Sequence, residues 1–413
     1  MSYAPLMPVD EAVNRVLAAF RPTAEETVPL GQALGRFTAG PVMARSTNPP
    51  FNASAMDGYA ARAADLDVLP ATLRVIGESA AGHPFGGSVR MGEVVRIFTG
   101  APVPDGADCI IIQENAERRE NIDGATITTQ DAVSAGKHVR LKGGDFREGQ
   151  RLLEAGVRIS FAHVALIGAA DLGAVTVRRK PRIAIISNGD ELVDPGSPRT
   201  TGQIPASNAV ALKAMIEESG GRAEDLGIAR DSIASIQDTV ARAAGFDLII
   251  TIGGASVGDH DLIQQALQPK GLDVDFWRIA MRPGKPLIFG RIGDTPMLGL
   301  PGNPVSALLC GFLFALPALR QMLGAPTPVN RPLRARLKAP LGSNGPRQAY
   351  LRATLSYGED GALGVTPLNQ QDSAYLSPLA RADALIIRPP HAEPSDPGDL
   401  VDVLCLNAVN RSH

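Results

Sequence analysis

Hydrophobic positions along residues 181–324 recur in short runs separated by amphipathic stretches. Arg182–Ser187 and Phe246–Ile252 are almost wholly apolar, which is typical of parallel strands covered on both faces. Ser207–Ser219 places apolar residues at helical spacing and is followed by two glycines, so it predicts a helix that ends there. This alternation predicts an α/β domain with a doubly wound parallel sheet and right-handed crossovers.

The rest of this region continues the alternation. We expect a helix from Asp231 or Ser232 to about Ala244, a helix at 259–267, strands near 286–289 and 297–300, and a long apolar helix after Asn303. The uncharged stretch 304–319 is shorter than the ~20 residues that a membrane span needs, so a buried helix is expected there. Ligands of such sheets bind beyond the carboxyl ends of the strands, where the loops are therefore candidate sites.

The flanking segments have other patterns. Val89–Ile112 and Ala125–Val139 are short β runs broken by Gly and Pro, with helical segments before and after them, which indicates one or two α+β units. Residues 325–332 form a proline-rich linker. Beyond it, Arg347–Leu355 and Ala384–Arg388 alternate in polarity and predict a small β domain.

Composition narrows the class of protein. A chain of 413 residues with 44% hydrophobic and 20% charged residues is typical of a globular protein with two to four domains. The 40 basic residues nearly balance 43 acidic ones and aromatics are only 4%, so neither a nucleic acid nor a membrane surface is an expected partner. Residues 8–20 read as an amphipathic helix rather than a signal peptide. Three distant cysteines form no metal-binding pair, and a cytoplasmic location fits them.

The sharpest local feature is the loop Gly253–Gly258 (GGASVG), which follows a predicted strand and precedes a helix. Its glycines allow close approach of the backbone to an anion, and the helix start offers free N–H groups. A tight βα turn explains it equally well, since neither dinucleotide nor P-loop spacing is present. The letters also match the G-x-S-x-G elbow of serine hydrolases around Ser256. His260 is too close and His391 lies in another domain, so the hydrolase is kept only as an alternative.

Three further loops follow strands of the same region. Ser187–Glu191 carries two carboxylates, Met281–Pro286 carries Arg282 and Lys285, and Leu300–Ser306 opens a helix. Gly, Pro, Asn and Asp are common in tight turns for conformational reasons, so these loops could also be ordinary turns. Carboxylates facing a glycine-rich loop, with cations nearby, nevertheless suit a Mg²⁺ ion that bridges substrate phosphates.

Two motifs of the N-terminal half are polar and turn-rich, and on physical grounds alone they read as ordinary loops. They are the first two of six motifs that follow one another along the chain: SAMDGYA at 54–60, TGAPVPDGAD at 99–108, SNGDEL at 187–192, GGASVG at 253–258, RPGKP at 282–286 and LPGNPVSA at 300–307. In this order they resemble the molybdopterin molybdenumtransferases, the MoeA-type proteins that are also found as the last domain of gephyrin. The resemblance covers nearly the whole chain.

The resemblance implies a function and an architecture. Such proteins insert molybdate into adenylylated molybdopterin with Mg²⁺, release AMP, and work in the cytoplasm as homodimers with a site shared between subunits. Transient contact with a molybdopterin adenylyltransferase is implied as well. The expected fold is α/β plus α+β with four domains: domain I at 1–47 and 142–180, domain II inserted at 48–141, domain III at 181–325 resembling the adenylyltransferase, and the small β domain IV at 326–413.

The resemblance also implies site residues, position by position. The expected catalytic residues are Asp57, Thr99, Glu191, Asp231, Asp261 and Lys285, with Glu191 and Asp261 as metal ligands. The expected substrate-binding residues are Asp145, Gly253, Gly254, Ser256, Gly258, Arg282, Pro301, Gly302, Asn303, Pro304, Ser306, Arg347, Arg352 and Ser373. Asp57, Thr99 and Asp145 are expected to reach the partner's site. No protein nucleophile is expected, so positioning and electrostatics would carry the rate.

The sequence departs from the family pattern at three places. Arg282 stands where many relatives have Lys, Asp372 and Ala374 flank Ser373 where glycines are common, and Asp259-His260-Asp261 replaces Glu-Ala-Asp. Two other classes remain as alternatives. A non-catalytic scaffold would not need the acids and the lysine, and a stand-alone adenylyltransferase would not need the residues before 181 or after 324.

Overall fold

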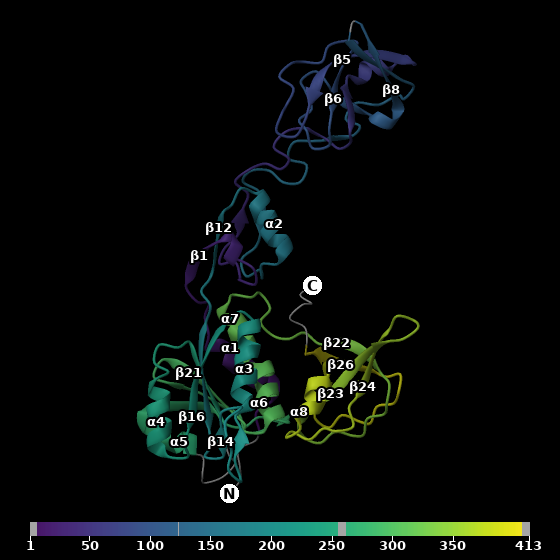
Figure 1. The fold of residues 1–413 in the computed structure, drawn as a ribbon. Helices are drawn as coiled ribbons and strands as arrows, with labels where there is room; N and C mark the ends of the chain where they lie inside the picture. Colours follow the sequence, from purple (N-terminus) through teal and green to yellow (C-terminus); the bar gives the residue numbers. More distant parts are fainter. Residues whose placement is uncertain (1–5, 123, 255–261, 407–413) are drawn as a thin grey trace.

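The computed structural model describes residues 6–122, 124–254 and 262–406, and the chain folds into an elongated molecule with several separate units (Figure 1). The unit that matters most for the site contains a six-stranded sheet. Its strands, from one edge to the other, are β16 (Arg222–Ala229), β13 (Arg182–Asn188), β17 (Leu248–Ile252), β21 (Thr295–Leu300), β20 (Ile288–Ile292) and β18 (Leu272–Phe276). The first four strands are parallel, which confirms the predicted α/β fold.

The last two strands differ from the predicted all-parallel sheet. β20 runs antiparallel to β21, and β18 runs antiparallel to β20. Only Gly293 and Asp294 separate β20 from β21, and a parallel crossover needs a dozen residues or more. β18 has the alternating sequence Leu-Asp-Val-Asp-Phe, with Leu272 and Phe276 buried, as an edge strand would have.

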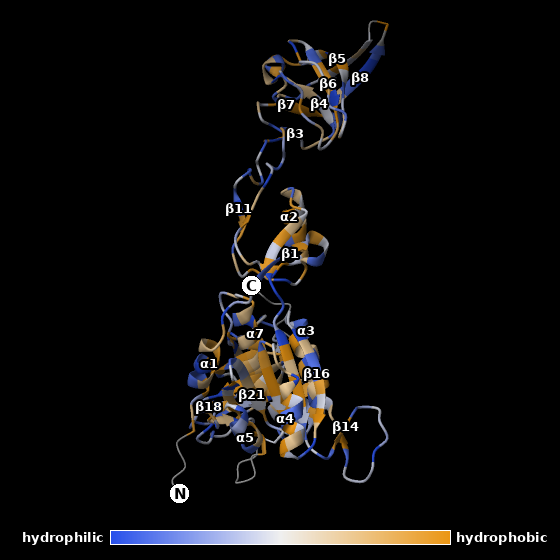
Figure 2. Cartoon of the chain, turned by 90° about the vertical axis from the view of Figure 1, so that its left-hand side faces the viewer, coloured by the Kyte–Doolittle hydropathy of each residue, from blue (hydrophilic) through white to orange (hydrophobic). Residues whose placement is uncertain are grey.

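Successive residues of the central strands point to opposite faces of the sheet, so they belong to two separate cores. Ile183 and Ile185 lie in one core, and Ala184 and Ile186 lie in the other. The first core is covered by α1 (Val9–Ala18), α3 (Ser207–Glu218), α6 (Pro304–Cys310) and α7 (Leu316–Met322), and the second by α4 (Ile233–Ala241) and α5 (Leu262–Leu267), which is followed by the 3-10 turn Gln268–Lys270. Figure 2 colours the hydrophobic residues of these strands and helices orange.

The long apolar helix lies in this core. α6 and α7 are joined by a π-helical turn at Gly311–Ala315, so helical structure is continuous over Pro304–Met322. By length and composition this segment could cross a membrane, but 83% of its most apolar window is buried inside the protein. A Cβ on Gly311 would lie 2.4 Å from Leu212 Cδ2, so the start of the π-helical turn approaches α3 closely. The prediction of a buried helix is confirmed.

The first helix also packs in the α/β unit. α1 lies beside α7, and Val9, Ala12 and Val16 belong to the same core as the central strands. Met7, just before it, forms a parallel bridge with Ile279. The resemblance places residues 1–47 together in domain I, whereas the structure divides this stretch between two units.

A second unit lies between the α/β unit and the far end of the molecule (Figure 1). Two antiparallel pairs build it, β1 (Glu25–Pro29) with β12 (Ala174–Arg178) and β2 (Val42–Met43) with β11 (Arg151–Leu153), together with the 3-10 turn Leu30–Gln32 and helix α2 (Phe161–Ala169). Each pair joins an early segment to one more than a hundred residues later, so the chain leaves this unit and returns to it.

The intervening segment forms the third unit, at the far end of the molecule. Its six-stranded sheet has the order β7 (Cys109–Ile112), β4 (Gly58–Ala61), β6 (Glu93–Ile97), β5 (Ala71–Ser79), β9 (Gly124–Thr129) and β8 (Ala116–Asn121), with 3-10 turns at Ala63–Leu66 and Gln113–Asn115. A short pair, β3 (Ala53–Ser54) with β10 (Val139–Arg140), joins the two chain segments that lead to it.

The predicted small β domain is confirmed as a barrel. Its strands are β22 (Leu333–Leu337), β23 (Gln348–Tyr357), β24 (Leu363–Pro367), β25 (Ala384–Arg388) and β26 (Leu400–Cys405), and α8 (Leu376–Arg381) precedes β25. β23 pairs with both β24 and β25, which closes the barrel. The short strand β19 (Met281–Arg282), from the α/β unit, adds to β23 in parallel and links the two units.

Candidate functional site

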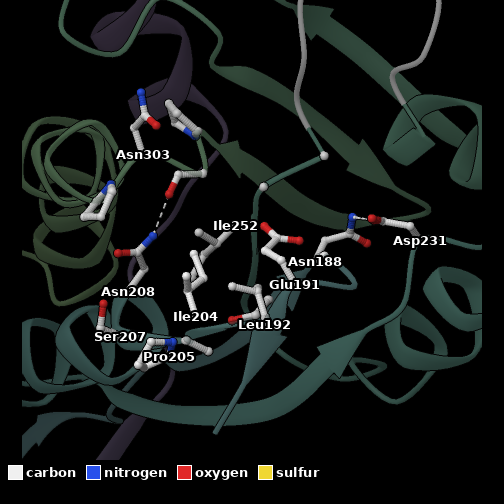
Figure 3. Close-up of a pocket in the computed structure, with 18 of the residues that line it drawn as sticks. Asn188, Glu191, Leu192, Ile204, Pro205, Ser207, Asn208, Asp231, Ile252 and Asn303 are labelled. Carbon is white, nitrogen blue, oxygen red and sulfur yellow. Dashed lines mark hydrogen bonds between the residues drawn. The ribbon is translucent and has the colours of Figure 1, made fainter. Parts of the chain in front are cut away.

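A pocket of about 920 Å³ opens at the carboxyl ends of β13, β17 and β21 (Figure 3). The register of these strands explains why their loops meet there. Ser187 pairs with Ile252, and Ile252 pairs with Leu300, so the three loops leave the sheet at the same level. A short parallel pair, β14 (Leu192–Val193) with β15 (Ile204–Pro205), forms another wall. The prediction that the ligand site lies at this edge agrees with the pocket.

A network of amide and carboxylate groups orders the end of β13. Asn188 is buried, and its Nδ2 donates to Asp231 Oδ1 at 2.8 Å (Figure 3). Asp231 Oδ2 accepts the Asp190 N–H at 3.3 Å, and Asp190 Oδ1 accepts the Asp231 N–H at 3.2 Å. Both carboxylate oxygens of Asp231 therefore accept hydrogen bonds from other groups of the protein. This arrangement gives Asp231 a loop-ordering role beside the pocket.

Glu191 is the carboxylate that the pocket leaves open. It is exposed and lines the wall, and none of the described residues donates a hydrogen bond to its carboxylate. Gly189 has a φ of +150°, and a Cβ there would lie 2.2 Å from Glu191 Oε2. The glycine thus leaves room for the carboxylate to fold back over the backbone.

The glycine-rich loop comes close to the backbone of its neighbours. Gly253 and Gly254 have φ values of +87° and +71°, a region that side chains disfavour. A Cβ on Gly253 would lie 2.6 Å from Asn188 O, and one on Gly254 would lie 2.8 Å from Ile263 Cγ1. Gly302 faces the same turn, since its Cβ would lie 3.7 Å from Gly253 Cα. Main chain rather than side chains therefore walls this side of the pocket.

The turn at 301–304 opens the long apolar helix. Pro304 is its first residue, where a missing N–H costs nothing. Asn303 is the N-cap residue, but its side chain makes no capping bond to the helix. Asn208, from α3, donates its Nδ2 to Gly302 O at 2.9 Å and holds the turn in place (Figure 3). Pro301, Gly302, Asn303 and Pro304 all line the pocket, and Ser306 is buried behind them.

The turn that carries the two cations lies between the α/β unit and the barrel. Pro286 lines the pocket, but Lys285, which is half-buried, and Arg282, which is exposed, do not. Gly284 has a φ of +110°, and a Cβ there would lie 2.8 Å from Cys310 Sγ. The turn thus rests on α6, and complete burial raises the pKa of the Cys310 thiol, which makes it a packing group.

The barrel brings a further polar group to the pocket. Ser373 Oγ accepts from Asn303 Nδ2 at 3.1 Å, and the neighbouring Ala374 lines the pocket. Arg347 is half-buried and directly precedes β23. Arg352 is fully buried, so its guanidinium has no open path to a ligand. The Asp372 carboxylate accepts the Ala374 N–H at 2.8 Å and so holds this loop.

Asp57 and Thr99 come together, but far from the pocket. The N–H and Oγ1 of Thr99 both donate to Asp57 Oδ1, at 2.7 and 2.8 Å. These bonds, with a smaller effect of the Arg96 charge, lower the pKa of Asp57. Their sheet occupies the end of the molecule opposite to β14 at the pocket (Figures 1 and 2). Asp145 lies in the connection between these ends, where its Oδ2 accepts from Asn48 Nδ2 at 3.1 Å.

Three expected site residues, Ser256, Gly258 and Asp261, lie outside the described residues. The hydrolase alternative depends on Ser256 and gains no support from the structure. Among the residues that are described, no three His, Cys, Asp or Glu side chains gather as a metal cage would need.

Two amide side chains of this pocket, the buried Asn188 and the half-buried Asn208, have structural roles that the sequence does not predict. Asn188 was part of a recognised loop, but its polarity at the end of an apolar strand was the only signal of a structural role. Asn208 sits in the first turn of a helix that was identified by its apolar residues, and nothing local marks its contact with Gly302, which is almost a hundred residues away.

The chain matches three family models in succession. They are the MoeA N-terminal region with domains I and II at residues 7–170, a probable molybdopterin binding domain at 184–321, and the MoeA C-terminal region or domain IV at 334–406. The second model covers the sheet and the pocket.

Known proteins resemble the chain over most of its length. The molybdopterin molybdenumtransferase of Haemophilus influenzae is 36% identical over 321 residues, which are 77% of this chain and 78% of that protein. The molybdopterin molybdenumtransferase of Bacillus subtilis is 32% identical over 98% of this chain and 95% of its own. A crystal structure of a molybdopterin biosynthesis MoeA protein from Pyrococcus horikoshii is 33% identical, with a TM-score of 0.81 over 97% of this chain and 99% of its own.

Gly253→Ala should destabilise the protein more than an alanine at another left-handed glycine. Gly245 has a φ of +80° with nothing within 4 Å of its Cβ position, so Gly245→Ala should lose only the ~1–2 kcal/mol of the disfavoured backbone. Gly253→Ala adds a clash with Asn188 O and should lose about 1–3 kcal/mol more. Urea unfolding of both variants measures the difference. Equal losses would show that the loop does not depend on this close approach.

Thr99→Ala should raise the pKa of Asp57 toward its usual range, because one of the two donors to Oδ1 is lost. Thr99→Ser keeps the hydroxyl and should leave that pKa low. Since the pKa is lowered by folding, the contact stabilises the fold above the ordinary carboxyl pKa and is lost as pH falls through the lowered value. A ¹³C NMR titration of the Asp57 carboxyl reads the shift. An unchanged titration in Thr99→Ala would contradict the role given to the hydroxyl.

Proposed function

Because the chain belongs to the molybdopterin molybdenumtransferase family, we propose that it inserts molybdate into adenylylated molybdopterin with Mg²⁺ and releases AMP. The enzyme is a transferase of molybdenum cofactor biosynthesis. The observation that carries the proposal is the pocket itself, which lies in the segment matched by a molybdopterin binding model and joins two glycine turns, a helix start and an open carboxylate. In the reaction two dithiolene thiols replace one molybdate oxygen, which leaves as water, and one water cleaves the phosphoanhydride; molybdenum stays at +6.

The residues of the pocket fit a Mg²⁺ ion. This metal takes one or two carboxylates together with substrate phosphates and water. Glu191 offers a carboxylate with no described protein donor, while Asp231 is committed to Asn188 and the Asp190 N–H. Glu191 would therefore hold the metal, with Asp261 as the second expected ligand. When bound, Mg²⁺ would neutralise negative charge as the adenylate leaves.

Molybdate is a tetrahedral dianion and needs cationic and hydroxyl donors. Lys285 and Arg282 come from one turn, and this turn is bonded to the barrel strand that follows Arg347. Ser373, on the barrel loop that contacts Asn303, adds a hydroxyl. We assign Lys285, Arg282, Arg347 and Ser373 to molybdate. Arg282 would bind the oxyanion through a planar fork, where a lysine acts as a point charge.

A homodimer would bring Asp57 and Thr99 to a pocket, since in one chain they lie at opposite ends of the molecule (Figure 1). Helix α2 supports this assembly. Its sequence, Phe-Ala-His-Val-Ala-Leu-Ile-Gly-Ala, carries no formal charge, yet only Ile167 is buried (Figure 2). Helices that are apolar all round are normally covered. A second copy of the chain would cover this face.

Two further parts of the proposal concern the setting. Cys109 and Cys310 are buried free thiols and Cys405 is half-buried, which fits a reducing cytoplasm. The adenylylated substrate must come from an adenylyltransferase, and transient contact with that enzyme would hand it over directly. A non-catalytic scaffold is less well supported, because a scaffold has no need of the open Glu191 beside the ordered glycine turns.

Purified protein mixed with adenylylated molybdopterin, molybdate and Mg²⁺ should release AMP in proportion to the molybdenum inserted. Glu191→Gln should lower this rate about 10- to 150-fold, the equivalent of one charge-assisted interaction of about 1.5–3 kcal/mol. Excess Mg²⁺ should partly restore it. Glu224→Gln, an exposed acid on the edge strand β16, is the matched control and should keep the wild-type rate. No AMP from the wild type would refute the function, and a wild-type Mg²⁺ dependence in Glu191→Gln would refute its metal role.

Ala165→Glu should dissociate the proposed dimer, because it places a charge in the exposed apolar face of α2. Multi-angle light scattering at micromolar concentration should give twice the mass of one chain for the wild type and the mass of a single chain for the variant. Ala234→Glu adds the same charge to the exposed face of α4 and should remain dimeric. A monomeric wild type would remove the shared-site model.

A further inference from the structure

One strand of the barrel reaches both turns that flank the pocket. β23 pairs with β19, so that Met281 lies beside Gln348 and Arg282 beside Ala349. The Gln348 N–H also donates to Ala280 O at 2.8 Å. The same strand carries Arg352 four residues later. The segment with Arg282 and Lys285 is therefore fixed by the first residues of β23, and Arg352 lies in the middle of the same strand.

Arg352 holds the loop that precedes Ser373. Its Nη2 donates to Gln370 O at 3.1 Å and to Asp372 O at 3.2 Å. Its backbone adds a closed pair with Gln371, whose Oε1 accepts the Arg352 N–H at 3.0 Å and whose Nε2 donates to Arg352 O at 2.9 Å. The side chain is completely buried, and burial lowers the pKa of Arg352, an effect that the Asp372 charge opposes. Burying a charged guanidinium costs free energy unless its hydrogen bonds compensate for the lost hydration.

The loop so held supplies the cap of the long helix. The Val305 N–H, which has no partner inside the helix, donates to Ser373 O at 3.0 Å. Asn303 occupies the N-cap position but makes no capping bond; instead its Nδ2 donates to Ser373 Oγ. An N-cap residue normally serves the helix with its own side chain. Here the carbonyl of Ser373 takes the place of that cap, and the Ser373 hydroxyl holds the Asn303 side chain.

We propose that Arg352 is a positioning residue: its buried guanidinium fixes the 370–372 loop so that Ser373 caps the helix at Asn303–Val305 and shapes that wall of the pocket. Contact between Arg352 and substrate is not part of this role, because the side chain is sealed from the pocket. The consequence for turnover rests on the proposed function, whereas the consequence for the helix cap does not.

A matched control exists in the same barrel. Arg388 lies on β25, which pairs with β23, and it is also buried. It donates to two loop carbonyls, those of Gly342 and Glu393, and its Nη1 donates to Ser395 Oγ at 2.6 Å. This loop makes none of the contacts to Asn303 or Val305 described above. Arg352→Met and Arg388→Met thus remove equivalent buried arginines, and only the first should affect the helix start.

Hydrogen exchange at the Val305 amide, measured without substrate, tests the cap directly. Arg352→Met should speed this exchange at least about fivefold, which corresponds to about 1 kcal/mol of capping energy. Arg388→Met should leave it at the wild-type rate. Unchanged exchange in Arg352→Met, or equal acceleration in both variants, would overturn the proposal. If Arg352→Met does not fold, Arg352→Lys and Arg388→Lys give the same comparison, since lysine keeps the charge but lacks the planar fork.

The rate of AMP release then shows whether Arg352 acts through Ser373 or only stabilises the barrel as a whole. If AMP release is observed for the wild type, Arg352→Met should lower kcat/KM at least about fivefold, and Ser373→Ala should lower it as well. In the Ser373→Ala background, Arg352→Met should then cause a smaller loss than it does alone, because part of the shared path is already broken. Fully additive losses would show that Arg352 does not act through Ser373.

Discussion

The register of three parallel strands is the constraint on which the pocket depends. Because Ser187, Ile252 and Leu300 pair side by side, the chain leaves β13, β17 and β21 at one level and three loops are forced together. Their backbones then approach so closely that Gly253 cannot carry a Cβ without meeting Asn188 O. The buried apolar strands thus fix a wall of main-chain groups. Such a wall is rigid, because its position depends on the sheet and not on side-chain rotamers.

The groups around this wall divide into those that hold the protein and those left for a ligand. Asp231 and Asn208 form hydrogen bonds with nearby backbone or side-chain groups, and one oxygen of Asp57 accepts from Thr99. Glu191 has no described donor. A polar residue in a site motif can therefore either order the protein or bind a ligand. The hydrogen-bond partners of its atoms distinguish these two roles. Arg352 shows the same distinction for a cation.

Local pattern was sufficient to predict much of the α/β unit. The apolar run at 182–187, the amphipathic stretch at 207–219 and the apolar helix after Asn303 appear almost where they were expected. The edge strand β18 escaped, because its alternating residues resemble a surface segment. The packing of α1 on α7 and the pairing of Glu25 with Arg178 could not be predicted, since each depends on residues far away in the sequence. Of the site, the loops were predictable and the caps and amides that hold them were not.

The elongated shape places one electrostatic requirement on the proposed function. A carboxylate brought from a second copy, as Asp57 would be, meets an anionic substrate beside the carboxylate of Glu191. Like charges that are brought together repel one another, and more strongly where water is partly excluded. A cation among them would offset this repulsion. In the proposed dimer, the Mg²⁺ ion assigned to Glu191 would therefore also offset the charge of Asp57, and assembly of the shared site would depend on metal and substrate together.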